Sequence, residues 1–425
     1  MQTTTAYDAI LKEDYQGPIR DELNENTNLV KHFTKTDATN YPWEGRVMIV
    51  PLHHGRNVGV KATAEGGLVP AAGAQAHDKL QIPMTFWESR IQLTIQVMKA
   101  SRTSKGAFAQ AMEVEKSRLV NDVSRQRNRA LAGAGYGILA IVSSTNAPAI
   151  VLKNPGGVTG TTNPVRYILP GMVVAFHVGS TSALRGVATV VSIDSASQIT
   201  LDAMPVGTVA NDAVTIGASA GGVTEGSYAI EAMGILGLVD STTYVSSIFG
   251  IDRSLAANAY FRSLVSTSTG SLTRDLLFRF TDNAEEIGGV YIDKFLCHQS
   301  VRREYLKLQE GDARWPSAVG NLNPDIGSPA QKNDAPPRFS GSEIFTDKDF
   351  AYGTLVGYSS KNAFRAVETE GEWCDEDGGI LLRSPTSDAY EGRYRLFEQF
   401  FFDRGNGSFR LDGLNATVTS GVYAL

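Results

Sequence analysis

Cysteine, excess basic charge and long apolar runs are all scarce in this 425-residue chain, and each scarcity excludes a class of protein. Two cysteines, Cys297 and Cys374, are too few for a disulfide scaffold, so we expect a reducing environment. No run of about 18 apolar residues occurs, so we expect no membrane-spanning helix. The start, MQTTTAYDAI, lacks the basic and apolar regions of a signal peptide. The formal net charge of −6 argues against a chain-wide electrostatic grip on nucleic acid.

Motifs that carry chemistry are missing as well. The sequence has no GxxxxGK[ST] phosphate loop, no GxSxG nucleophile elbow and no HExxH zinc motif. His53 and His54 are adjacent, so a strand would send them to opposite faces and away from one shared metal. The acidic run DEDG at 375–378 departs from calcium-loop spacing and indicates a solvated turn. We therefore predict no catalytic residue, no cofactor and no metal site.

The stretch EGGLVPAAGAQ at 65–75 raises the question of whether its glycines bind phosphate or let the chain bend. Strand patterns flank it, RVMIVPL at 46–52 and the alternating QIPMTFWESRIQLTIQVM at 81–98. No helix follows, and Pro70 removes a backbone donor, so we expect the bendable tip of a long two-stranded excursion. Residues expected to touch another copy of the chain are Gly66, Gly67, Leu68, Val69, Pro70 and Gly73.

Two helical patterns lie on either side of this excursion. Gly17-Pro18 can open a short helix in an N-terminal arm, because proline suits the first helical position. Its narrow apolar stripe needs a surface outside the arm, and we expect contacts with a neighbouring copy from Ile19, Leu23, Val30 and Phe33. The longest helix is predicted from Ser104 to about Leu131, with a packing face made of Phe108, Met112, Leu119 and Val123. Its basic residues are expected to form salt bridges rather than to bind phosphate: Arg118, Arg125, Arg127 and Arg129.

The second half of the chain alternates between β-rich and mixed sequence. Residues 145–220 are rich in Val, Thr, Ala, Gly and Ser, which predicts a small all-β barrel or sandwich inserted into a larger α+β domain. Mixed sequence returns after Gly226, with a helix from about Ser300. Near the end, Asn406-Gly407 between RYRLFEQFFF and SFRLDGL predicts a β-hairpin with a type I′ turn.

The order of these elements resembles the major capsid proteins of tailed bacteriophages, which have the HK97-type fold. The arm DYQGPIRDELNENTNLVKHF, the strand RVMIVPL, the loop NVGVKATAEGGLVPAAG, the strand TFWESRIQLTIQVM, the long helix, the segment IDKFLCHQSVRREYLKL and the final strands follow the family's order. The resemblance implies an α+β fold with these parts: N-terminal arm 1–50, extended loop 51–98, spine helix and part of the peripheral domain 99–144, inserted β domain 145–220, axial domain with a peripheral return 221–385, and terminal peripheral strands 386–425.

The resemblance also implies a structural, non-enzymatic function. Copies would assemble through pentamers and hexamers into an icosahedral shell that encloses the phage genome without sequence-specific DNA binding. Assembly in the host bacterial cytoplasm would place the chain in the virion capsid, with no membrane contact. Partners would include a portal complex, a decoration protein and a scaffolding protein that is separate, because the arm begins almost at Met1. Lys61 and Lys79 flank the loop, but a full covalent crosslinking set cannot be matched.

Two alternatives stay open at the level of sequence. An encapsulin-like cellular nanocompartment shell has the same fold, although the β insertion and the chain length weigh against it. A β-rich hydrolase acting on a polymer would need an apposed pair of acids in one cleft, and the sequence offers no such pair.

Overall fold

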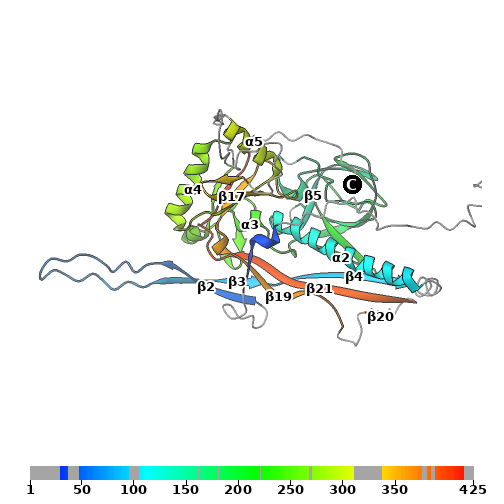
Figure 1. The fold of residues 1–425 in the computed structure, drawn as a ribbon, viewed down its shortest axis with the longest axis horizontal. Helices are drawn as coiled ribbons and strands as arrows, with labels where there is room; N and C mark the ends of the chain where they lie inside the picture. Colours follow the sequence, from blue (N-terminus) through cyan, green and yellow to red (C-terminus); the bar gives the residue numbers. More distant parts are fainter. Residues whose placement is uncertain are drawn as a thin grey trace, which may run out of the picture.

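The computed structural model describes residues 29–36, 47–94, 105–160, 162–179, 181–220, 222–267, 270–310, 337–375, 381–383 and 388–415. These residues form a body of two sheets with helices, a separate barrel and a long two-stranded extension that leaves the body (Figure 1). Among them, no helix is both long and apolar enough to cross a bilayer. We call the two sheets the peripheral sheet and the axial sheet.

The peripheral sheet is long and lies beneath the longest helix (Figure 1). Its strands run in the order β1 (Thr34–Lys35), β19 (Ala363–Trp373), β21 (Ala389–Phe402) and β20 (Leu381–Arg383), with β4 (Thr85–Thr94) paired to β21. The helix is α2 (Lys105–Ala132), which matches the sequence prediction to within a residue at each end. The single strand predicted over 81–98 is divided at Met84: its first residues belong to β3 (Ala76–Pro83), which pairs with a different strand, and Thr85–Thr94 form β4. The alternation is correct for β4, because β4 lies in a sheet with one face toward the body.

The axial sheet has six strands and carries its helices on one face. The strand order is β14 (Leu264–Ser266), β22 (Phe409–Leu411), β18 (Leu355–Tyr358), β15 (Lys294–Cys297), β17 (Ser342–Thr346) and β16 (Arg338–Phe339). Helices α4 (Arg274–Gly288) and α5 (Gln299–Glu310) share a core with Phe295 and Cys297. Leu296, which points to the opposite face, belongs to the main core between the axial sheet, the peripheral sheet and the arm.

The barrel has its own core and closes on itself. Its strands are β5 (Ile138–Asn146), β6 (Ala149–Lys153), β9 (Gln198–Leu201), β8 (Leu184–Ile193), β7 (Val173–His177) and β10 (Ala213–Ala220), with β11 (Val223–Gly226) added to β10. Pairing of β10 with both β5 and β7 completes the ring. The β-rich region thus extends beyond 145–220, because β5 begins inside the glycine-rich sequence that follows α2.

The smaller elements connect these parts. They are η2 (Val30–His32), η4 (Pro155–Gly157), α3 (Ile235–Leu238), β12 (Ser247–Ile248), β13 (Ile251–Asp252), η5 (Ala256–Phe261) and η6 (Ser360–Asn362), together with the extension strands β2 (Val47–Gly55) and β3 (Ala76–Pro83).

The predicted C-terminal hairpin is wrong. β21 stays in the peripheral sheet, whereas β22 joins the axial sheet beside β14 and β18. The chain crosses between the sheets at 403–408, where a Cβ on Gly405 would lie 2.1 Å from the carbonyl oxygen of Phe261. Ser263 holds this crossing by donating to the Gly405 carbonyl at 2.8 Å. Backbone packing at the crossing therefore overrides the local Asn406-Gly407 turn preference.

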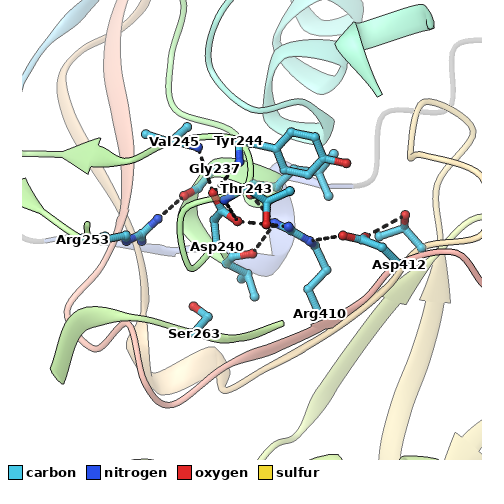
Figure 2. A network of polar contacts seen from close by, with 12 residues as sticks. Gly237, Asp240, Thr243, Tyr244, Val245, Arg253, Ser263, Arg410 and Asp412 are labelled. Atoms are coloured by element: carbon cyan, nitrogen blue, oxygen red, sulfur yellow. Dashed lines mark hydrogen bonds and ion pairs between the residues drawn. The ribbon is translucent and has the colours of Figure 1, made fainter. Parts of the chain in front are cut away.

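Arg410 of β22 explains why this strand belongs to the axial sheet. Its side chain is fully buried and forms an ion pair at 3.0 Å with the equally buried Asp240 (Figure 2). It also donates to the carbonyls of Leu236 at 2.9 Å and Val239 at 2.7 Å, which lie at the end of α3. A second guanidinium, that of Arg253, donates to two further carbonyls of the same short helix.

Asp240 receives backbone donors in addition to Arg410. The N–H groups of Thr243, Tyr244 and Val245 lie 3.1, 2.7 and 2.8 Å from its carboxylate oxygens (Figure 2). Arg410 also contacts the Asp412 carboxylate at 2.9 Å and lies over the Tyr244 ring. The two buried charges are thus neutralised and hydrogen-bonded, which is the condition for tolerating them in a core.

We expect Arg410→Met to lower the free energy of unfolding by about 3–5 kcal/mol, because it leaves Asp240 buried without its cation. Urea unfolding of the unassembled chain measures this loss. The double variant Arg410→Met, Asp240→Asn should recover part of the loss because no uncompensated charge remains. A cost below about 1 kcal/mol for the single variant would contradict this role.

Candidate functional site: the extension and its anchors

The extension is the part of the chain that the body covers least. β2 and β3 pair antiparallel from Val47–Pro83 to Gly55–Ala76, and only the foot of this ribbon enters the main core. The buried foot residues are Met48, Val50, Leu80 and Ile82. Beyond the foot, the two strands of the extension project from the body as a thin ribbon (Figure 1). A two-stranded ribbon is only marginally stable by itself in water, so this shape calls for a further surface.

One asparagine organises the distal part of the extension. Asn57 donates to the Gly73 carbonyl at 2.9 Å and accepts from the Gly59 N–H at 2.7 Å. A Cβ on Gly73 would lie 2.3 Å from the Asn57 side-chain oxygen, so any larger residue there would displace the Asn57 side chain. At the far end, Gly67 N–H bonds the Ala64 carbonyl at 2.9 Å, and Gly66 adopts a φ of 73°. The glycines therefore build a defined turn and a close strand approach.

The tip exposes apolar side chains on both sides of the loop that joins β2 and β3. Val58 and Val60 are 84% and 82% exposed, and Leu68 and Val69 are 86% and 85% exposed. Pro70 is partly shielded within the same loop. Single exposed apolar residues are ordinary, but four large ones on one thin loop form an unusually apolar exposed surface.

The foot of the extension is held to η5 by polar and aromatic contacts. Tyr260 donates to the Asp78 carboxylate at 2.6 Å, and the His54 ring stacks on the Tyr260 ring at 4.0 Å. This hydrogen bond lowers the pKa of Asp78, with help from the Lys79 N–H, against the opposing effect of burial. His53 lies on the other face, beside His77 at 5.0 Å, so the two adjacent histidines do diverge.

The structure places the arm differently from the expected contact with a neighbour. Phe33 is buried in its own chain, where its ring packs against Phe400 at 5.1 Å and Phe402 at 6.0 Å. Val30 packs partly buried against the same core. The expected neighbour contact is therefore wrong for Phe33, because the open edge of β19 pairs with β1 and draws the arm onto the body. Ile19 and Leu23 lie outside the described residues.

Helix α2 is anchored by the basic cluster near its end. Arg127 forms a two-pronged ion pair with Glu398 of β21, at 2.5 and 2.8 Å, and Arg365 of β19 reaches the same carboxylate at 2.6 Å. Arg129 pairs with Glu231 at 2.5 Å. For these arginines, the predicted salt bridges are present.

The predicted packing face of α2 is described only in part. Leu119 and Val123 are half-buried, whereas the side chains of Phe108 and Met112 lie outside the described residues. Arg125 pairs with Asp122 at 3.2 Å, one turn away on the same helix.

Nothing in the described part of the chain assembles into a catalytic or metal site. No group of three His, Cys, Asp or Glu residues there is placed to hold a metal ion. Asp347 and Asp349 do lie together, but Asp347 is buried, and the cavity beside Asp349 is only about 20 Å³. Burial raises the pKa of the Cys297 thiol to about 12, so this cysteine is a core residue. Of the acidic run at 375–378, only Asp375 is described, and it is exposed.

Three residues that organise this region gave no sequence signal. Asn57, Tyr260 and Glu398 each have at least one partner that lies between 16 and 271 positions away. Asn57 lies in an ordinary polar loop, and Glu398 lies inside an apolar strand, where a lone buried carboxylate suggests a partner of opposite charge but does not identify it.

Comparison with known proteins gives a fold and no close relative. No family model and no curated protein matches the sequence. Among solved structures, the chain is similar to a chain of the cyanophage A-1(L) capsid asymmetric unit, with 8% identity, a TM-score of 0.55, and coverage of 97% of this chain and 99% of that one. It is also similar to a chain of the capsid of an empty GTA particle, with 8% identity, a TM-score of 0.50, and coverage of 97% and 98%.

At such low identity the likeness concerns the path of the backbone, and it runs over nearly the full length of each chain. The arm, the extension, the long helix over the peripheral sheet and the axial sheet with its helices are the parts that the sequence pattern placed in this order. The chain therefore has the HK97-like fold of phage major capsid proteins, an α+β architecture with more strand than helix.

Proposed function

We propose that this chain is a major capsid protein whose copies form pentamers and hexamers and close into an icosahedral shell around a phage genome. The observation that carries the proposal is the extension, a thin ribbon with four large exposed apolar side chains at its tip. Such a ribbon gains stability only when another surface covers it, and many identical copies supply that surface repeatedly. The fold shared with phage and GTA capsid chains supports this reading.

The finer features of the proposal follow the same logic. The barrel between Ile138 and Gly226 is a domain inserted between the long helix and the axial region. The shell encloses DNA without reading its sequence, which agrees with the net charge of −6. A separate scaffolding protein, a portal complex and a decoration protein are the expected partners. Assembly takes place in the cytoplasm of a host bacterium, and the chain remains in the virion.

Negative-stain electron microscopy and sedimentation of the expressed chain test the proposal. Closed particles of uniform size are the expected result. A chain that stays monomeric at all concentrations, with and without phage lysate, would overturn it. Nuclease-protected DNA inside particles from a phage lysate separates a virion shell from an encapsulin-like compartment, which would hold protein instead. The polymer-hydrolase alternative has no support in the described residues, since the paired acids lie beside a cavity too small for a sugar unit.

The double variant Leu68→Ser, Val69→Ser should stop or strongly reduce particle formation, because it removes apolar surface that only a neighbour would bury. The unfolding midpoint of the unassembled chain should stay unchanged, since both side chains are exposed there. Sedimentation and thermal unfolding measure the two effects. Val206→Ser is the matched control: Val206 is 94% exposed on a barrel loop, and its replacement should leave assembly intact. Equal particle yields from all three proteins would contradict the role of the tip.

Gly66→Ala should impair assembly more than subunit folding, because it strains the turn that shapes the tip. Gly171→Ala is the control for strain alone, since Gly171 has a φ of 83° and, like Gly66, has open space around its Cβ position. Each change should cost about 1 kcal/mol of local stability. Particle yield should fall only for Gly66→Ala, and a fall of the same size for both variants would count against a special role of the tip.

Gly73→Ala tests the Asn57 clamp, because its Cβ would displace the Asn57 side chain. Asn57→Ala should reproduce the effect, since it removes both bridging hydrogen bonds. We expect faster proteolysis within 56–75 in both variants and lower particle yield, with unchanged unfolding of the body. Wild-type proteolysis rates in both variants would show that the clamp does not order the tip.

A further inference from the structure

Three parts of the chain meet at one asparagine. Asn128, near the end of α2, accepts a hydrogen bond from the N–H of Leu29 in the arm at 3.2 Å. Its amide nitrogen donates to both carboxylate oxygens of Asp347 at 3.0 Å, and to Asp349 at 2.8 Å. Both aspartates lie on the loop after β17 of the axial sheet. Asn128 therefore joins the arm and the helix to the axial sheet.

The barrel reaches the same loop from the other side. Arg166 and Tyr167 donate to the Asp349 carbonyl at 3.1 and 2.8 Å. The Arg166 guanidinium lies between the rings of Tyr167 and Tyr352, at 4.5 and 5.3 Å from their centres. We call the set Leu29, Asn128, Asp347, Asp349, Arg166 and Tyr167 the junction. Through Arg166 and Tyr167, the junction also connects the barrel to the loop after β17 that Asn128 binds.

The junction brings two carboxylates onto one amide group. The two amide protons of Asn128 face three carboxylate oxygens, and Asp347 is only 4% exposed. Asp347 also accepts a hydrogen bond from the Asp349 N–H at 2.8 Å. One added proton on Asp347 would remove the repulsion between the two carboxylates that share the Asn128 amide.

We propose that the junction is an acid-favoured lock, in which a proton on Asp347 fastens the arm and the barrel to the long helix and its loss loosens them. Burial, then the charge of Asp349, raises the pKa of Asp347 to about 6, against the opposing effects of Asn128, the Asp349 N–H and Lys348. An unperturbed aspartate has a pKa of 3.8. Because the folded value is the higher one, the added stability is complete below about pH 4 and is lost as the pH rises through about 6.

The other charged groups facing the loop do not produce this change. Burial acts to lower the pKa of Arg166, but Tyr167, Tyr352 and Asp349 outweigh it and raise this already high pKa further. Burial raises the pKa of Tyr167, so neither group titrates near pH 6. Burial and the charge of Arg166 lower the pKa of His298 to about 4, so it stays neutral between pH 5 and 8. Arg129 is held by Glu231. Asp347 is thus the group whose shifted pKa lies in this window.

Hydrogen exchange of the Leu29 amide in the intact, unassembled chain tests the lock, because this N–H bonds Asn128 directly. After correction for intrinsic rates, its protection should be at least about tenfold higher at pH 5 than at pH 7.5, since one pKa unit corresponds to a factor of ten. Asp347→Asn imitates the protonated form and should give high protection at both pH values.

Asp403→Asn is the matched control. Burial raises the pKa of Asp403 to about 6 as well, but Asp403 lies at the crossing after β21 and makes no contact with Asn128. This variant should keep the wild-type pH dependence at Leu29. Equal wild-type protection at both pH values, or an unchanged pH dependence in Asp347→Asn, would overturn the proposal.

If Asp347→Asn does not fold, Asp349→Asn replaces it and should move the transition to lower pH, because it removes the neighbouring charge. These measurements need no particles, so their failure and the failure of the proposed shell function are separate outcomes.

Discussion

The buried ion pair between Arg410 and Asp240 is the interaction on which the arrangement of the two sheets depends. A fully buried guanidinium is tolerated only where its donors find acceptors, and Arg410 finds them in Asp240, in Asp412 and in carbonyls at the end of α3. These acceptors lie beside the axial sheet, so β22 must leave the peripheral sheet to reach them. The crossing at 403–408 follows from this requirement, and it ties both sheets to one continuous stretch of chain.

The body and the extension follow opposite principles. In the body, buried charges such as Glu398 and Asp240 each receive several donors, and the apolar side chains close into cores. In the extension, the backbone is ordered by Asn57 and by glycines, yet Leu68 and Val69 remain in water. Local order without burial is what a docking element needs, because a preformed shape reduces the entropy lost on binding. The extension thus combines local backbone order with an apolar tip that the single chain leaves exposed.

Local pattern predicted the elements whose stability is local, and it failed where distant contacts decide. The long helix, the alternating strand β4 and the extended loop were predictable, because the helical and strand periods and the glycines act within a few residues. The C-terminal hairpin was predicted wrongly, since the preference at Asn406-Gly407 is weaker than the burial of Arg410. The arm contact of Phe33 failed for a similar reason, as the open edge of β19 is invisible in sequence. The junction at Asn128 could not be foreseen, because its partners lie 99 to 221 positions away.

Three consecutive residues of α2 show how one helix can fix the geometry of the whole body. Side chains of neighbouring helical residues point about 100° apart, because there are 3.6 residues per turn. Arg127 binds Glu398 in the peripheral sheet, Asn128 binds Asp347 beside the axial sheet, and Arg129 binds Glu231 in the segment after the barrel. A rotation of the helix about its axis would break all three contacts at once. The end of α2 is therefore held in one orientation by contacts with the peripheral sheet, with the loop beside the axial sheet and with the segment after the barrel.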